Sequence, residues 1–299
     1  MRQPDEARPF GRLVTAMVTP FTTDGSLDVD GAQRLATYLV DEQRNDGLVI
    51  SGTTGESPTT SDEEKDRLLR AVVEAVGDRA SVIAGAGTND TAHTLHLAAA
   101  AEKAGADGVL LVTPYYSKPP QAGLLAHFRA AADATGLPAM LYDIPGRTGS
   151  AIRTETLVAL AEHPRIVAVK DAKGDFDASA WVMARTPLAY YSGDDKVTLP
   201  LLSIGAIGVV GVPTHLVGAR TKDMIEAYGK GDVAGALALH RALLPAYTGF
   251  FRTQGAILTK AALRLAGQPG GPVRLPLVDA TEAEIETLRA DLAAAHVDI

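Results

Sequence analysis

The stretch "IVAVKDAKGD", which runs from Ile166 to Asp175, begins with a short apolar run that ends on a lysine. An uninterrupted apolar run of this length is typical of a strand that is covered on both faces, as in a parallel sheet. Lys170 places an amine where the next core side chain would be expected. The stretch therefore raises two questions: which fold surrounds this strand, and why the strand ends on a cation.

Other short runs rich in valine, leucine and isoleucine alternate with helical patterns along the chain. Expected strands cover residues 13–21, 47–51, 81–86, 108–113, 139–143, 166–170, 189–193 and 207–212. Expected helices cover residues 28–45, 61–77, 90–105, 119–136, 154–164, 177–185 and 196–204, and a last one follows Pro213. Eight strands with eight crossovers predict a (β/α)8 barrel, the TIM barrel of the α/β class. An open doubly wound sheet fits less well, because "GAGTND" at Gly85 lacks the third glycine of a dinucleotide-binding loop.

The alternation ends near residue 230, after which only helical patterns remain. They cover residues 232–248, 253–265 and 281–295. Thr281 and Glu284 have the spacing of a capping box, which marks the start of the last helix. We therefore expect a barrel with the active site at residues 1–230 and a helical appendage at residues 231–299, in which 267–276 is a linker.

Composition limits the possible functions. The 299 residues are 46% hydrophobic and 21% charged, which is typical of a soluble globular protein. The net charge is −8 without a basic run, so we expect no nucleic-acid or anionic-membrane partner. Cysteine is absent, which excludes disulfides, thiol nucleophiles and cysteine-bound metals. No apolar segment is long enough for a membrane span, and the polar segment at residues 1–12 does not resemble a signal peptide, so we expect a cytoplasmic enzyme.

Active sites of such barrels lie at the C-terminal ends of the strands, and Lys170 is in that position. Burial there lowers the pKa of an amine, and a neutral amine can attack a carbonyl to form a Schiff base. The alternative is a lysine whose ammonium group reaches solvent or pairs with Asp171 or Asp194. Lys173, three residues further on, is expected to be a solvated loop charge.

Three other strand ends carry polar residues of interest. Thr53 and Thr54 stand in the glycine-flanked "GTTGES", which could hold a small carboxylate or be a plain turn with a helix cap. Tyr142 could transfer protons or be a buried tyrosine with a satisfied hydroxyl. Arg147 in "PGRTG" could hold a second carboxylate or be a surface arginine. Tyr116 belongs to a tyrosine pair that could be a loop edge or an interface.

Two groups of residues could suggest a metal. His93 and His96 are three apart on an expected outer helix, without a third ligand nearby, so a solvated helix face is favoured. Asp194 and Asp195 in "SGDD" are expected to cap the following helix. A metal-dependent barrel hydrolase therefore stays a lesser alternative, as does a barrel that binds ligands without catalysis.

Taken together, the motifs resemble those of a known family. They are "TAMVTPF", "GTTGES", "VTPYYSKPP", "LYDIPGRTG", "VKDAKG" and "SGDD". In this combination and order they resemble the dihydrodipicolinate synthase family of pyruvate-dependent class I aldolases, over nearly the whole chain. The resemblance implies a lyase that condenses pyruvate with L-aspartate 4-semialdehyde in lysine and diaminopimelate biosynthesis.

The resemblance also implies roles for individual residues. Lys170 would form a covalent imine with pyruvate, so that no cofactor and no metal are needed. Tyr142, Thr53 and Tyr116 would form a proton relay. The tyrosine that matches Tyr116 reaches into the neighbouring subunit's site in the family, which implies a homotetramer built from tight dimers.

Substrate binding is likewise implied by the resemblance. Thr54 would hold the pyruvate carboxylate, and the backbone carbonyls of Gly193 and Val210 would line the site. Arg147 would hold the semialdehyde carboxylate. N-acetylneuraminate lyases of the same superfamily have an apolar residue there, so Arg147 favours the synthase activity over that alternative.

Two departures from the family pattern concern specificity and regulation. Gly211 replaces a serine after the last strand. At the positions where lysine-sensitive members bind lysine, this chain has Ser57, Pro58, Asp62, Lys65, Asn89, His93 and Tyr115. Because His93 replaces a glutamate that would pair with the ligand's ammonium group, we expect lysine inhibition to be weak or absent.

Overall fold

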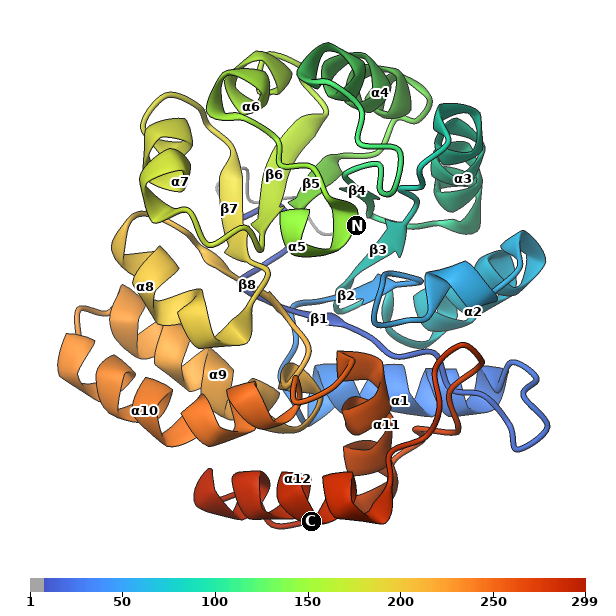
Figure 1. Ribbon diagram of the computed structural model, residues 1–299, viewed down its shortest axis with the longest axis vertical. Helices are drawn as coiled ribbons and strands as arrows, with labels where there is room; N and C mark the ends of the chain where they lie inside the picture. Colours follow the sequence, from blue (N-terminus) through green and yellow to red (C-terminus); the bar gives the residue numbers. More distant parts are fainter. Residues whose placement is uncertain (1–7) are drawn as a thin grey trace.

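A computed structural model describes residues 8–299, and its centre is a closed barrel of eight parallel strands (Figure 1). The strands follow one another around the barrel in sequence order. They are β1 (Leu13–Ala16), β2 (Gly47–Ile50), β3 (Ser81–Gly85), β4 (Gly108–Val112), β5 (Ala139–Asp143), β6 (Ile166–Asp171), β7 (Ala189–Ser192) and β8 (Gly208–Gly211). The predicted TIM barrel is confirmed. Most of the polar segment predicted at residues 1–12 lies outside the described residues.

A ring of helices surrounds the barrel in Figure 1. The helices from α1 to α9, with the short 3₁₀ helices η1 and η2, are α1 (Val29–Asp41), η1 (Ser57–Thr59), α2 (Asp62–Val76), α3 (Thr91–Ala104), α4 (Gln121–Asp133), α5 (Pro145–Thr148), α6 (Thr154–Leu160), α7 (Phe176–Met183), η2 (Asp195–Val197), α8 (Thr198–Ser203) and α9 (Thr214–Gly229). The short helix α5 was not predicted, because four residues are too few to show a helical period.

Local sequence explains where several helices begin and end. Ser61 and Glu64 form the full capping box at the start of α2, with each side chain bonded to the other residue's backbone N–H. Asp90 accepts hydrogen bonds from two backbone N–H groups at the start of α3. Gly105 ends α3 at a φ of 88°, in the left-handed region that favours glycine.

Two apolar layers enclose the strands. The outer layer lies between the strands and the surrounding helices, and includes Leu48, Leu111 and Leu141. The inner layer fills the barrel itself with side chains such as Val49 and Met140. The barrel is therefore a packed core, and only its strand ends are free for chemistry.

Phe10 closes the barrel at the end opposite the strand C-termini. Its ring packs so closely on Gly108 that a Cβ there would lie 2.5 Å from the ring. The hydroxyl of Tyr191, from inside the barrel, donates a hydrogen bond of 2.9 Å to the carbonyl of Gly11 beside it. The segment before β1 is thereby fixed to the barrel floor.

The barrel closes where β1 pairs with β8, with Val14 opposite Val210. His215, which follows β8, also binds the segment that follows β1: its Nε2 accepts a hydrogen bond of 3.1 Å from the backbone N–H of Val18. Its Nδ1 lies 2.7 Å from the Val212 carbonyl, and therefore carries the proton. Because Val18 bonds to a side chain and not to a strand, β1 ends at Ala16 and not at the predicted residue 21.

The C-terminal region consists of α10 (Val233–Gly249), α11 (Gly255–Leu265) and α12 (Glu282–Ala294), as predicted. Figure 1 shows these helices on one side of the barrel, with α10 beside α9 and α11 near α1. Val217 of α9 shares one apolar cluster with Leu243, Leu258 and Leu288 from the three C-terminal helices. A domain boundary at residue 230 stays a prediction.

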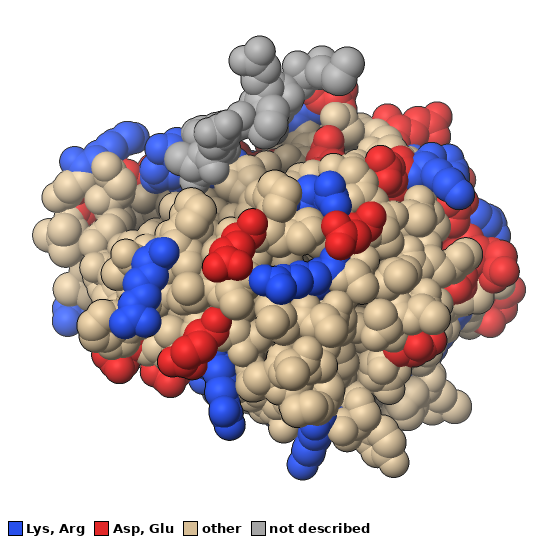
Figure 2. Space-filling model, turned by 90° about the horizontal axis from the view of Figure 1, so that it is seen from above, with Lys and Arg blue, Asp and Glu red and all other residues tan. Residues whose placement is uncertain are grey.

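Acidic and basic side chains are interspersed on the face that Figure 2 shows. This mixture agrees with the absence of a basic run in the sequence. In the part of the chain that the structure describes, the helices are too short or too polar to cross a membrane.

Candidate active site

Lys170 is buried near the C-terminal end of β6, with only 4% of its surface exposed. In the sheet register it stands beside Tyr142 of β5 and Tyr191 of β7. The pKa of its ammonium group is lowered to about 8, mainly by burial; the charge of Asp195 opposes this change and that of Arg147 adds to it. Near neutral pH this lysine can therefore supply an uncharged amine.

Tyr142 covers the amine. The Lys170 nitrogen lies 4.2 Å from the centroid of the Tyr142 ring. Burial raises the pKa of the Tyr142 phenol well above its ordinary value, so the hydroxyl keeps its proton. Tyr142 therefore presents a protonated phenol next to the amine.

A cavity of about 250 Å³ opens at this end of the barrel, and Thr53, Tyr142 and Arg147 are part of its wall. Its other lining residues are Ser51, Gly52, Ser57, Pro58, Gly85, Gly87, Leu110, Val112, Tyr115, Ile144 and Thr148. Lys170 does not line the cavity itself but reaches its wall through the Tyr142 ring. The motifs that contain Thr53, Tyr115 and Tyr142 therefore meet around one cavity, which has the size of a small substrate.

Arg147 is presented by α5, which Figure 1 shows in front of the barrel's centre. Pro145 begins this single turn and Gly149 ends it at a φ of 76°. The Arg147 side chain is exposed, and within residues 8–299 no carboxylate forms an ion pair with it. Its guanidinium group is therefore available for a ligand.

The turn from Gly52 to Glu56 places the two threonines differently. Thr53 is exposed and lines the cavity, whereas Thr54 is buried. The turn is closed by the Glu56 N–H, which donates to the Thr53 carbonyl at 3.2 Å. The Thr19 hydroxyl also donates to the Gly55 carbonyl at 2.7 Å. Hence Thr53 is in the cavity wall, whereas Thr54, the next residue of the turn, is buried and does not line the cavity.

Gly193 follows β7 and lies against the lysine. A Cβ at Gly193 would be 2.9 Å from the Ala172 Cβ and 3.1 Å from the Lys170 Cγ, so only glycine fits without displacement. Val210 is buried in β8. Both predicted backbone positions are therefore at the barrel end that holds Lys170.

The two tyrosines after β4 point to different places. Tyr115 lines the cavity, whereas Tyr116 is 89% exposed at a φ of 72°. The structure does not bring Tyr116 to the cavity of its own chain. Its predicted place in a proton relay therefore depends on a second subunit.

Lys173 was predicted to be a solvated charge, and this prediction is wrong. Only 7% of its side chain is exposed, and its Nζ lies 3.6 Å from the Oδ2 of Asp143, which is fully buried. Burial raises the pKa of the Asp143 carboxyl to about 6, although the charge of Lys173 opposes this change. This pair could not be predicted from local sequence, because Asp143 ends β5 and Lys173 lies in the loop after β6.

The prediction that Asp194 and Asp195 cap the next helix is confirmed only for the position of Asp194, which is the N-cap residue of η2. Asp194 makes no side-chain capping bond to η2. Asp195 is buried, and its Oδ2 accepts a hydrogen bond of 3.2 Å from the Val212 N–H beyond β8. Burial raises the pKa of Asp195 to about 7. Sequence reasoning missed this buried carboxylate near Lys170.

The glycine at 211 is explained by the same carboxylate. A Cβ at Gly211 would lie 2.2 Å from the Oδ1 of Asp195 and 2.8 Å from the Cγ2 of Thr214. A serine here would need one of these groups to move. The departure from the family pattern thus follows from the position of Asp195 in this chain.

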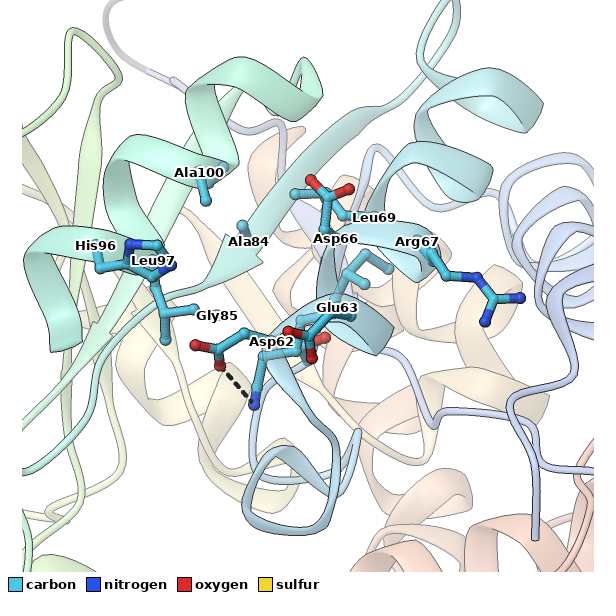
Figure 3. Close-up of a pocket in the computed structure, with 14 residues that line it drawn as sticks. Asp62, Glu63, Asp66, Arg67, Leu69, Ala84, Gly85, His96, Leu97 and Ala100 are labelled. Carbon is cyan, nitrogen blue, oxygen red and sulfur yellow. Dashed lines mark ion pairs between the residues drawn. The ribbon is translucent and has the colours of Figure 1, made fainter.

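A second, larger cavity of about 400 Å³ lies between α2 and α3 (Figure 3). Its wall includes the apolar Leu69 and Leu97, and its rim carries Asp62, Lys65 and His96. Neither Tyr142, which covers Lys170, nor Arg147 is part of its wall. The cavity with Tyr142 and Arg147 is therefore the better candidate for chemistry, although it is smaller.

The histidine pair of α3 lies near this second cavity. His93 contacts Asp62 through its Nε2 at 2.9 Å, and the rings of His93 and His96 stack with centroids 6.5 Å apart. Among the described residues, no cluster of three or more side chains is arranged to hold a metal. The use of no metal and no cofactor stays a prediction.

Fold and site together define a class. The protein is a (β/α)8 barrel with a desolvated lysine at the C-terminal end of a central strand, the arrangement used by enzymes that act through a lysine Schiff base. A model of the dihydrodipicolinate synthetase family matches residues 9–295. The chain belongs to this family.

Curated relatives agree with this assignment. A protein of Acidothermus cellulolyticus, named 4-hydroxy-tetrahydrodipicolinate synthase, is 77% identical over 96% of this chain and 93% of its own. A protein of Streptomyces coelicolor, named 4-hydroxy-tetrahydrodipicolinate synthase 2, is 63% identical over 97% of both chains. Such identity over whole chains implies the same fold.

Solved structures are similar as well. A dihydrodipicolinate synthase from Cyanidioschyzon merolae, described with lysine bound, is 44% identical and superposes with a TM-score of 0.94 over 96% of this chain and 98% of its own. Another, described as the first monomeric variant of such a synthase, is 37% identical with a TM-score of 0.92 over 96% of this chain and 98% of its own. The fold of the family therefore extends over nearly the whole chain.

Proposed function

We propose that this protein is a 4-hydroxy-tetrahydrodipicolinate synthase, a lyase that joins pyruvate to L-aspartate 4-semialdehyde in lysine and diaminopimelate biosynthesis. The observation that carries the proposal is Lys170, a buried amine whose pKa is lowered to about 8 beside a cavity that contains Tyr142 and Arg147. The family and its relatives' names support the choice of reaction.

In the first half of the reaction, Lys170 becomes joined to pyruvate. Its neutral nitrogen attacks the ketone carbon, the ketone oxygen leaves as water, and an imine remains. Tyr142 donates the proton that this oxygen needs, and Thr53 passes protons to and from the phenol. Loss of a proton from the pyruvate methyl group then gives an enamine. Thr54 holds the pyruvate carboxylate through the glycine-flanked turn.

In the second half, the enamine carbon attacks the aldehyde carbon of the semialdehyde. The amino group of the semialdehyde then displaces the Lys170 nitrogen from the imine carbon, which closes the ring and restores the lysine. Arg147 holds the semialdehyde carboxylate, because its free guanidinium projects from α5 over the cavity. The backbone carbonyls of Gly193 and Val210 complete the wall.

Assembly is part of the proposal. Tyr116 is 89% exposed next to Tyr115, which lines the cavity of its own chain. An aromatic side chain with this exposure is suited to an interface, where it would complete the relay of a neighbouring subunit. We propose a homotetramer built from tight dimers, which light scattering would detect as four chains. Tyr116→Ala would weaken the dimer and lower turnover.

The remaining features of the proposal concern cofactors and location. The covalent imine on Lys170 makes a cofactor and a metal unnecessary, and dialysis against a chelator should leave activity unchanged. We propose the cytoplasm as the location, because pyruvate is supplied there by central metabolism. An N-acetylneuraminate lyase-like activity is the second candidate for a pyruvate-dependent aldolase, and it is disfavoured by Arg147.

The direct test is to trap the imine. Reduction with borohydride in the presence of pyruvate should add the reduced pyruvyl group to Lys170, as read by peptide mass spectrometry. A coupled assay with pyruvate and aspartate semialdehyde should show turnover. Lys170→Met should abolish both, with a loss of more than about 10³-fold in kcat. Full turnover by Lys170→Met would contradict the proposal.

A further inference from the structure

Glu56 ends the turn that carries Thr53 and Thr54, and its backbone is in an unusual conformation. Its φ is 56°, in the left-handed region that side chains other than glycine rarely adopt. Only 2% of its surface is exposed. A strained backbone that holds a buried carboxylate persists only where its surroundings impose it.

The C-terminal region supplies the charge that Glu56 needs. Lys260 of α11 is 0% exposed, and its Nζ lies 2.5 Å from the Oε1 of Glu56. The same nitrogen donates a hydrogen bond of 2.7 Å to the carbonyl of Pro272. It also lies 4.3 Å from the centroid of the Phe21 ring. A fully buried ammonium group is thus satisfied by one carboxylate, one carbonyl and one aromatic face.

The other oxygen of Glu56 is bound by the same region of the chain. Its Oε2 accepts a hydrogen bond of 2.8 Å from the backbone N–H of Arg274. The Arg274 guanidinium then binds both oxygens of Glu64 at the start of α2, at 2.6 and 2.8 Å. Residues of the C-terminal region therefore hold the middle of the loop between β2 and α2 and the first turn of α2.

Stability alone does not explain such a pair. Replacing a buried ion pair by apolar residues of similar volume is often neutral or stabilising, because two charges must be desolvated to form it. In some proteins a buried polar or ionic group instead fixes one geometry out of several. Here the fixed geometry belongs to the turn whose Thr53 lines the cavity.

We propose that Glu56 and Lys260 are positioning residues of the active site, through which the C-terminal helical region sets the turn that binds the pyruvate carboxylate. The inference rests on the proposed function, since that function gives Thr53 and Thr54 their roles. Neither Glu56 nor Lys260 touches the reacting atoms; they act through the backbone between Thr53 and Glu56.

The test compares three variants by pyruvate-dependent borohydride labelling of Lys170 and by steady-state kinetics. Lys260→Met leaves a buried carboxylate without its partner, so we expect both the melting temperature and the affinity for pyruvate to fall. The double variant Glu56→Gln with Lys260→Met removes both charges, so its melting temperature should return toward that of the wild type. Its KM for pyruvate should nevertheless stay raised by about tenfold, because misplacement of binding groups is costly even when the fold is intact. Its KM for the semialdehyde should change by less than about twofold.

Arg252→Gln is the matched control. Arg252 pairs with Asp291 in the same C-terminal region, but about half of its side chain is exposed. Its loss should leave both KM values unchanged. A double variant whose labelling needs no more pyruvate than that of the wild type would overturn the inference while the proposed function stands. Absence of pyruvate labelling in the wild type would overturn both.

Discussion

The side-chain nitrogen of Lys170 lies 4.2 Å from the centroid of the Tyr142 ring, and the two residues stand directly opposite in β5 and β6. The aromatic face favours the charged amine, whereas burial lowers its pKa to about 8. The ring of Tyr142 therefore acts on the charge of the lysine, and its hydroxyl is free to serve a different purpose. These two contributions can be separated by mutation.

Tyr142→Phe keeps the ring and removes the hydroxyl. We expect kcat to fall by about 10²- to 10³-fold, which is typical for the loss of a general acid. The pH dependence of pyruvate labelling at Lys170 should keep its midpoint, because the aromatic face is retained. Stopped-flow measurements of imine formation between pH 6 and 10 would check this result. A shifted midpoint would show that the hydroxyl, and not the ring, sets the pKa of the lysine.

Arg147→Ala should separate the two substrates. Labelling by pyruvate should persist, while the KM for aspartate semialdehyde should rise by about 10²-fold from the loss of a charge-assisted bidentate contact. The pKa of Lys170 should also rise, because the charge of Arg147 lowers it in the native protein. Since the neutral amine is the reactive form, the rise of the imine-formation rate with pH should move to higher pH. Equal losses for both substrates would contradict the assigned role.

Gly211→Ala tests the contact with Asp195. The new Cβ would lie 2.2 Å from the carboxylate, so we expect the free energy of unfolding to fall by about 1–3 kcal/mol. Adding Asp195→Ala should restore part of that loss, which a double-mutant cycle would measure by urea unfolding. Gly123→Ala in α4 is the control, since its nearest neighbours would be 3.5 Å away, and it should be neutral or stabilising. Additive effects of the changes at 211 and 195 would contradict the explanation.

Lysine should inhibit this enzyme weakly or not at all. Asp62, Glu63 and Asp66 are the carboxylates in the wall of the second cavity. Asp62 already contacts His93 at 2.9 Å and Lys65 at 3.7 Å, and the dashed line in Figure 3 marks its ion pair with Lys65. An incoming ammonium group would therefore compete with Lys65, and with His93 when it is protonated, for Asp62. His93→Glu should increase sensitivity to lysine in a coupled assay. A Ki below about 1 mM for the wild type would contradict this prediction.

Much of the fold could be predicted from local sequence because its signals are local. The buried strands are continuous apolar runs, and pairs such as Ser61 with Glu64 mark helix starts. The end of β1 could not be predicted in this way. It depends on His215, which binds Val18 across the junction of the first and last strands.

Part of the candidate site could also be predicted, because the ends of the strands are recognisable from local sequence. The C-terminal strand ends identify Lys170 and Tyr142, and the structure places them together. The buried pair of Lys173 and Asp143 was not found, since a charge in a loop gives no sign of its own burial. Asp195 was missed because its carboxylate contacts Gly211 and Val212 at the end of a different strand, which local sequence does not show.

The pairing of Val14 with Val210 has a consequence for how the chain is made. During translation the first strand emerges long before its final neighbour, and one of its edges has no hydrogen-bonding partner until the last strand leaves the ribosome. The barrel can therefore close only late in synthesis. Until then the nascent chain exposes an unpaired strand edge, where other chains can pair with it. Such an edge is a site of aggregation from which chaperones protect a folding chain.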